Sequence, residues 1–67
     1  MNILILGSGG REYSIGLAIS KEKQQHNITF CPGNAATNLI GNNIDIKDYN
    51  NLATWAKENQ IDLTIVG

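Results

Sequence analysis

The segment Ile3-Leu4-Ile5-Leu6-Gly7-Ser8-Gly9-Gly10-Arg11-Glu12 (residues 3–12) decides the fold of this 67-residue chain. Its four apolar residues end directly at a glycine, which is typical of a strand covered on both faces, as in a parallel sheet. A glycine-rich turn that leads from such a strand into a helix can hold a phosphate, because the backbone approaches the anion closely and the first helical amides lack partners. The alternative is that these glycines only make a tight turn.

Alternating strand and helix patterns continue along the chain. Apolar spacing predicts a helix over about residues 11–23, with Ile15, Ala18 and Ile19 on its apolar side and Gly16 where it lies close to the sheet. The later segments predict a strand at 28–31, a short helical turn within 35–40, a strand at 44–46, a helix at about 49–59 and a strand at 63–66. Because helices separate the strands, we expect an α/β, Rossmann-like parallel sheet in the order strand, helix, strand, long loop, strand, helix, strand.

Single side chains carry further expectations. Asp48 is placed to cap the second helix by accepting hydrogen bonds from its first amides. The spacing of that helix predicts a buried stripe, with its aromatic residues in the core, made of Tyr49, Leu52, Trp55 and Ala56. Cys31 is expected as a buried strand thiol, and His26, in a polar stretch, as a solvated residue between two elements.

Composition excludes several classes of function. The net charge is −1 and the charges are scattered, so no basic stripe for nucleic acid exists. No apolar run approaches the ~20 residues of a membrane span, and no basic residues precede the first apolar stretch as in a signal peptide. One cysteine and one histidine give no disulfide and no metal-ligand spacing. We therefore expect a cytoplasmic protein without a metal site of its own.

The size of the chain suggests part of a larger unit. A chain this short buries only about 60% of the surface that its unfolded form exposes, so its core is marginal. A doubly wound domain usually continues with further helices and strands beyond a fourth strand. We expect residues 1–67 to be the N-terminal part of a Rossmann-like domain.

Two common phosphate loops can be tested against residues 7–12. A Walker A loop needs Gly-Lys-Ser/Thr after four intervening residues, and no lysine occurs before Lys21. The dinucleotide fingerprint G-x-G-x-x-G/A matches at Gly7 and Gly9, but Glu12 takes the third position and no acid follows the second strand. A dinucleotide site therefore stays only as a minor alternative.

Three motifs together are more specific than any one of them. Gly-x-Gly-Gly-Arg-Glu at 7–12, Cys-Pro-Gly-Asn-Ala at 31–35 and Ile-Asp-Leu-Thr-Ile-Val-Gly at 61–67 resemble the beginning of the phosphoribosylamine–glycine ligases, also called glycinamide ribonucleotide synthetases. The resemblance covers essentially the whole chain. It implies an N-terminal pre-ATP-grasp domain of an enzyme of de novo purine synthesis, which joins glycine to 5-phosphoribosylamine and cleaves ATP to ADP and phosphate.

The resemblance also implies how the work is divided within the enzyme. ATP and Mg²⁺ (or Mn²⁺) would be held by later ATP-grasp domains that this chain lacks, so these 67 residues alone would be inactive, with no catalytic residue and no metal ligand. Two readings from other classes stay open. One is a non-catalytic nucleotide or sugar-phosphate binding module. The other is an α/β unit that self-associates through an exposed sheet edge.

Site residues follow from the matched motifs. The amides of Gly9 and Gly10 would face the substrate phosphate or ribose, and Arg11 would be a charge partner. Glu12 would contact ribose hydroxyls, the substrate amine or Arg11, because a carboxylate repels phosphate. The second substrate-binding loop would contain Pro32, Gly33 and Asn34.

The chain leaves open what Asn34 does and departs from the family at two positions. Asn34 would either bond to the substrate or brace its own turn. Tyr13 stands where the family usually has histidine, so a proton-transfer role there is in doubt and a packing role is favoured. Ala36 stands where the family usually has glycine, and we expect it to be tolerated unless a positive φ is needed.

Overall fold

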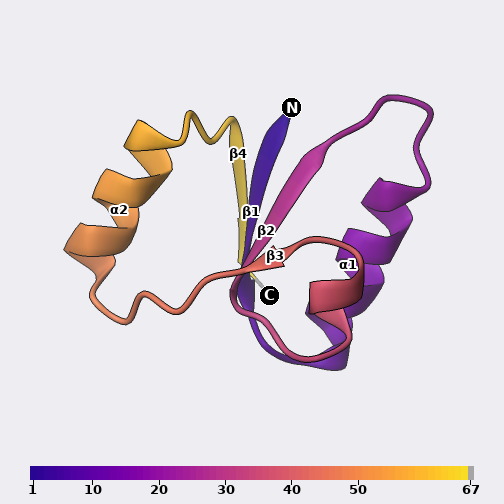
Figure 1. Cartoon of the computed structure of the whole chain (residues 1–67), viewed down its shortest axis with the longest axis horizontal. Helices are drawn as coiled ribbons and strands as arrows, with labels where there is room; N and C mark the ends of the chain where they lie inside the picture. Colours follow the sequence, from indigo (N-terminus) through magenta and orange to yellow (C-terminus); the bar gives the residue numbers. More distant parts are fainter. Residues whose placement is uncertain (67) are drawn as a thin grey trace.

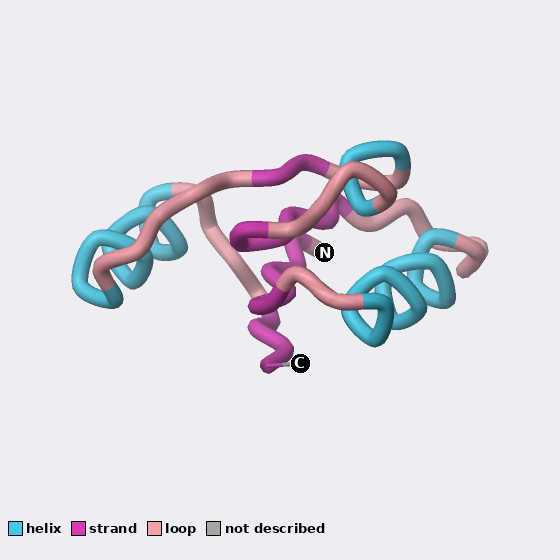
Figure 2. Tube along the Cα trace, turned by 90° about the horizontal axis from the view of Figure 1, so that it is seen from below, coloured by secondary structure: helices cyan, strands magenta, loops and turns pink. Residues whose placement is uncertain are grey.

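A four-stranded parallel sheet lies between two helices (Figures 1 and 2). The computed structural model describes residues 1–66. Its elements are β1 Asn2–Gly7, α1 Gly10–Ser20, β2 Asn27–Pro32, η1 Thr37–Leu39, β3 Asn42–Asn43, α2 Tyr49–Glu58 and β4 Leu63–Val66. The strand order is β3-β2-β1-β4, so the chain leaves the edge at β3 and returns through α2 to the other side of β1. The α/β parallel sheet expected from the sequence is confirmed.

The face of the sheet that α1 covers is tightly packed. Ile3, Ile5, Ile28 and Phe30 form its buried core, and Ile15 and Ile19 of α1 pack against them. Gly16 is required at this contact, because a Cβ atom there would overlap the ring of Phe30. The sequence correctly placed Ile15, Ile19 and Gly16.

Two details of α1 differ from the prediction. Ala18 is exposed, and Ile15 and Ile19 are the residues of α1 that pack against the core of the sheet. The helix ends at Ser20 rather than near residue 23, and the chain then turns so that Asn27 can donate its amide to the Met1 carbonyl at 3.0 Å.

The opposite face packs against α2. Leu4, Cys31 and Leu52 are buried there, which confirms Cys31 as a buried strand thiol, and Trp55 and Ala56 pack against this cluster. Asp48 caps α2 as predicted, with its side chain accepting from the amides of Asn50 at 2.7 Å and Asn51 at 3.3 Å.

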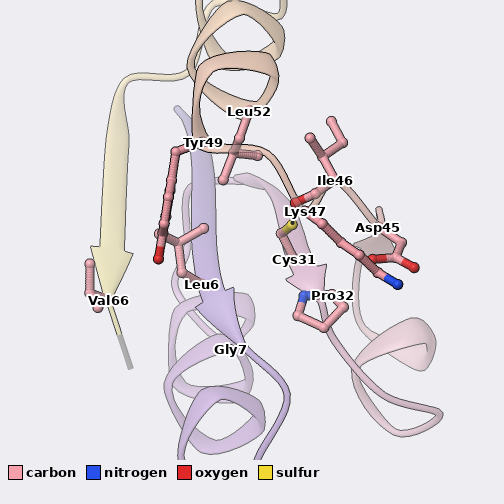
Figure 3. A pocket seen from close by; sticks show the side chains of 10 residues that line it. All are labelled: Leu6, Gly7, Cys31, Pro32, Asp45, Ile46, Lys47, Tyr49, Leu52 and Val66. Atoms are coloured by element: carbon pink, nitrogen blue, oxygen red, sulfur yellow. Dashed lines mark hydrogen bonds between the residues drawn. The ribbon is translucent and has the colours of Figure 1, made fainter.

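Tyr49 is not the core residue that the helical spacing predicts. It is 81% exposed. Leu52, one turn later, is the residue of α2 that lies buried against the sheet. Figure 3 shows Tyr49 at the start of α2, beside the carboxyl ends of the strands rather than over their middle. The apolar stripe of α2 therefore begins one turn later than its sequence suggests.

The third strand lies two residues earlier than predicted. Asn42 and Asn43 pair with Thr29 and Phe30 of β2, whereas the predicted strand at 44–46 is irregular. Ile44 still donates its amide to the Phe30 carbonyl at 2.9 Å, and its side chain then packs with Ile46 in the α2 cluster. Tertiary pairing outweighs the low strand preference of asparagine here.

The solvated position expected for His26 is wrong. Its side chain is only 8% exposed, and Nε2 lies 2.8 Å from Oε1 of Glu22, one helical turn earlier in sequence. The imidazole folds back over the turn between α1 and β2 instead of extending into water.

The strand β4 is an edge of the sheet among the described residues. Its side chains Leu63 and Val66 are 45% and 77% exposed. Self-association through this edge stays a prediction. Neither helix in residues 1–66 has the length and hydropathy that crossing a bilayer requires.

Candidate functional site

The carboxyl ends of β1, β2 and β4 meet at one edge of the sheet. In open α/β sheets this edge, at the point where the chain reverses its strand order, is where ligands bind. Here β1 pairs with β2 on one side and β4 on the other, so the reversal falls at β1. The glycine-rich loop that follows β1 and the loop that follows β2 both leave the sheet at this edge.

The glycine-rich loop is closed by a side chain of α1. Glu12 is only 7% exposed, and its Oε2 accepts a hydrogen bond of 2.8 Å from the amide of Gly9. Gly7 has a φ of +134°, in the region that favours glycine, and a Cβ atom there would lie 2.6 Å from Cδ of Glu12. Gly10 differs, because a Cβ atom there would meet nothing within 4 Å.

The start of α1 leaves several polar groups free. The amides of Gly10, Arg11 and Glu12 have no acceptor among residues 1–66. Arg11 is exposed and forms no ion pair with any other residue of 1–66. The Arg11 contact that was one option for Glu12 is therefore absent, and the guanidinium is available to an anion.

The loop after β2 is bonded to the glycine loop. The amide of Gly33 donates to the Gly7 carbonyl at 3.0 Å, and Nδ2 of Asn34 donates to the Ser8 carbonyl at 2.7 Å. Oδ1 of Asn34 accepts from the amide of Thr37 at 2.9 Å. Both ends of the Asn34 amide are thus used within the chain, which favours the bracing role over direct contact with a ligand.

Two residues that the sequence did not single out, the buried Thr37 and the half-buried Asn43, complete this loop. Thr37 is 0% exposed, and its hydroxyl lies 2.8 Å from Oδ1 of Asn43. Nδ2 of Asn43 donates to the Asn34 carbonyl at 2.7 Å. Gly33, with a φ of +74°, fits against Asn43 and Thr37 with no room for a Cβ atom. The loop is consequently held by a closed set of side-chain hydrogen bonds.

Next to these loops, a cleft of about 450 Å³ opens on the α2 face of the sheet (Figure 3). Its apolar lining comes from the strand ends and α2, and its polar rim from Asp45, Lys47 and Tyr49. The full lining consists of Leu6, Gly7, Cys31, Pro32, Asp45, Ile46, Lys47, Tyr49, Leu52 and Val66.

The predicted site residues therefore separate into two groups. Pro32 lines the cleft, whereas Gly9, Gly10, Arg11 and Glu12 form the adjoining glycine loop and helix start. Gly33 and Asn34 join the two loops. The rim residues Asp45, Lys47 and Tyr49 were missed, although the rule that parallel strands end at one edge places the segment after β3 there.

The two departures from the family motifs are accommodated. Ala36 has a φ of −70°, so no glycine is needed, as expected. Tyr13 is half-buried on the first turn of α1 and donates its amide to the Gly9 carbonyl at 3.3 Å.

Residues 1–67 match a single protein family, described as the N domain of phosphoribosylglycinamide synthetase. The chain belongs to this family. The resemblance drawn from the three sequence motifs is thereby confirmed. In this synthetase N domain, the candidate site is the edge of the sheet from which the loops after β1 and β2 leave.

Named relatives agree with this assignment. The N domain is 44% identical to a phosphoribosylamine–glycine ligase of Vibrio parahaemolyticus, covering 100% of this chain and 17% of that protein. It is 38% identical to the ligase of Rhodopirellula baltica, covering 98% and 16%. It is also 38% identical to the trifunctional purine biosynthetic protein adenosine-3 of Drosophila melanogaster, covering 97% and 5%. The chain thus spans about a sixth of the length of the bacterial ligases it matches.

A solved structure supports the same fold. The crystal structure of the phosphoribosylamine–glycine ligase of Thermotoga maritima superposes with a TM-score of 0.74 at 39% identity, over 100% of this chain and 16% of that chain. The four-stranded parallel arrangement is therefore that of a ligase N domain.

Proposed function

We propose that this N domain supplies the wall that binds the phosphoribosyl group of 5-phosphoribosylamine in a ligase that joins this amine to glycine with cleavage of ATP. The observation that carries the proposal is the pair of hydrogen bonds from Gly33 to Gly7 and from Asn34 to Ser8. These bonds unite the two loops whose motifs are shared with the ligases. They hold the two backbone loops together next to the start of α1, which carries the exposed Arg11.

The phosphate is placed at the start of α1. The unpaired amides of Gly10 and Arg11 point out of a helix N-terminus, where the helix dipole favours an anion. Gly10 carries no side chain, and its surroundings are open, so an anion can approach its backbone. Arg11 adds a planar pair of donors that suits phosphate. The mostly apolar lining of the cleft suits phosphate less well.

ATP and its metal are assigned to other parts of the ligase. Among residues 1–66, no three histidine, cysteine, aspartate or glutamate side chains group together as metal ligands. Glu12 is engaged by Gly9, and Asp45 is the only carboxylate on the rim of the cleft. The residues present therefore do not fit Mg²⁺ or Mn²⁺. We place these ions, ATP and glycine on the remaining domains of the ligase. We expect residues 1–67 alone to be inactive, and we expect the ligase to be a cytoplasmic protein.

Titration of the ¹⁵N-labelled chain with ribose 5-phosphate tests the binding role. We expect chemical-shift changes at Gly10 and Arg11, and a loss of affinity of roughly ten- to hundredfold in Arg11→Ala, since a hydrogen bond to a charged group contributes about 1.5–3 kcal/mol. Lys23→Ala is the matched control, because it removes one exposed positive charge beyond the other end of α1. Equal affinity in Arg11→Ala and the parent chain would remove Arg11 from the site.

A chimera tests the ligase role. This chain would replace the segment to which it aligns in the Vibrio parahaemolyticus ligase, with which it shares 44% identity. We expect ADP release that depends on both glycine and phosphoribosylamine. A chain that binds ribose 5-phosphate but gives a folded, inactive chimera would instead be a sugar-phosphate binding module. Binding of NAD in preference to ribose 5-phosphate would favour the dinucleotide alternative.

A further inference from the structure

Glu12 is a buried carboxylate whose partner lies inside its own loop. It is 7% exposed, and within residues 1–66 it pairs with no basic side chain. Its Oε2 accepts from the Gly9 amide at 2.8 Å. A buried charge is costly unless it is hydrogen-bonded, so this single contact fixes where the carboxylate lies.

The contact also explains why two of the three loop glycines are glycine. A Cβ atom at Gly7 would lie 2.6 Å from Cδ of Glu12, and one at Gly9 would lie 3.0 Å from Oε2. Nothing lies within 4 Å of the same position at Gly10. Gly7 and Gly9 therefore make room for Glu12, whereas no contact within residues 1–66 accounts for the glycine at position 10.

Glu12 supplies only the reciprocal half of a helix cap and leaves the first helical amides unpaired within residues 1–66. Gly9 is the N-cap residue of α1 and has no side-chain oxygen to offer the first helical amides. The third residue of the helix instead reaches back to the Gly9 amide, which is one half of a capping box. Its negative charge also lies favourably near the positive end of the helix dipole.

The hydrogen bond from Gly9 to Glu12 also affects where an anion can bind. A carboxylate bonded to Gly9 occupies that amide and repels a second anion beside it. The amides of Gly10 and Arg11 lie further along the chain and are unpaired. Glu12 thus leaves Gly10 and Arg11 as the part of the loop that is open to phosphate.

From these contacts we propose that Glu12 is a positioning residue, which holds the glycine loop through Gly9 and does not itself contact the substrate. The proposal refines the proposed function, on which its role in substrate binding rests. It replaces the contacts with ribose hydroxyls or the substrate amine that the family motif suggests. The affinity for substrate should depend more on how well Gly9 is held than on the charge at position 12.

Hydrogen exchange at the Gly9 amide, combined with titration by ribose 5-phosphate, tests this. In Glu12→Gln the carbonyl oxygen still accepts from Gly9, so we expect protection and affinity within about threefold of the parent chain. In Glu12→Ala the acceptor is lost, and both should fall by about tenfold or more. Glu58→Ala is the control, because it removes an exposed carboxylate at the far end of α2.

A packing measurement covers the case in which Glu12→Ala folds poorly. Gly9→Ala should lower the melting temperature of the parent chain, since the added methyl group presses on Oε2. In the Glu12→Gln and Glu12→Asp backgrounds, the loss of stability caused by Gly9→Ala depends on whether the side chain at position 12 can shift. The decisive pair is therefore Gly9→Ala alone and Gly9→Ala combined with Glu12→Ala. We expect the double variant to lose less stability than the sum of the single losses.

Each outcome bears on the proposal. Loss of affinity in Glu12→Gln with Gly9 still protected would show that the substrate contacts the charge of Glu12, and would overturn it. An unprotected Gly9 amide in the parent chain would overturn it as well. Absence of ribose 5-phosphate binding in the parent chain would instead count against the proposed function, and Gly9 protection across the variants would still decide whether Glu12 holds the loop.

Discussion

The two faces of the sheet are packed differently. On the α1 face, Phe30 is 0% exposed, and Gly16 lies so close that its missing side chain is what lets the helix approach. On the α2 face, Leu52 is the buried residue of the helix, and a cleft of about 450 Å³ remains at the strand ends. Tyr49, at the mouth of this cleft, is 81% exposed.

Because of this difference, the α1 face holds the glycine loop in place, whereas the α2 face leaves an open cleft. The glycine loop leads directly into α1, so the tight packing of α1 on the sheet fixes where the loop amides point. The segment before α2 packs Ile44 and Ile46 against the sheet but leaves Asp45 and Lys47 exposed on the rim of the cleft. The loop that we assign to substrate binding therefore leads into the helix on the tightly packed face of the sheet.

The largest expected effect comes from removing the centre of the tight face. Phe30→Ala should destabilise the chain by about 3–5 kcal/mol, through lost burial and the cavity left behind. A domain of 67 residues has a total stability of roughly 3–10 kcal/mol, so this loss is about a third or more of the total. Urea unfolding followed by circular dichroism measures the loss.

Leu52→Ala is the matched variant on the other face. We expect a cost of about 2–3 kcal/mol, near the low end for leucine, because the open cleft beside Leu52 lets its neighbours relax. Equal costs for Phe30→Ala and Leu52→Ala would contradict the contrast between the two faces.

The sequence predicted the tight face well for a physical reason. Strands β1, β2 and β4 are apolar runs ended by Gly or Pro, and the apolar spacing of α1 matches the face that it buries. The open face was predicted less well. The strand β3 is formed by Asn42 and Asn43, which have little strand preference and are placed by pairing with β2. Helical spacing likewise could not show that Tyr49 lies beyond the strand ends.

The candidate site shows the same limit. The loops at 7–12 and 32–35 were found because glycine, proline and asparagine mark turns, and their motifs match the family. The direction of a side chain cannot be read from such motifs. Glu12 turns inward and accepts from the Gly9 amide. The side-chain amide of Asn34 donates to the Ser8 carbonyl and accepts from the Thr37 amide. Thr37 was missed because no motif marks a buried hydroxyl.

A smaller effect is expected from the closest approach on the tight face. Gly16→Ala should destabilise the chain by up to about 2 kcal/mol, because overlap with Phe30 costs about 1–3 kcal/mol against a gain of about 1 kcal/mol in helix propensity. Gly10→Ala is the matched change in the same helix, where the added methyl group meets nothing. It should leave stability unchanged or raise it by up to about 1 kcal/mol. Thermal unfolding of both variants gives the comparison, and a stabilising Gly16→Ala would contradict the packing.

The smallest effect is expected at the mouth of the cleft. Tyr49→Ala should change stability by less than about 0.5 kcal/mol, since a side chain that is 81% exposed loses little burial. Asp48→Ala, one residue earlier, should cost about 1 kcal/mol because it removes the bonds to the amides of Asn50 and Asn51. Urea midpoints of the two variants measure this difference. If Tyr49→Ala cost more than Asp48→Ala, the tyrosine would be packed in the protein in solution, and the cleft would be closed where we describe it as open.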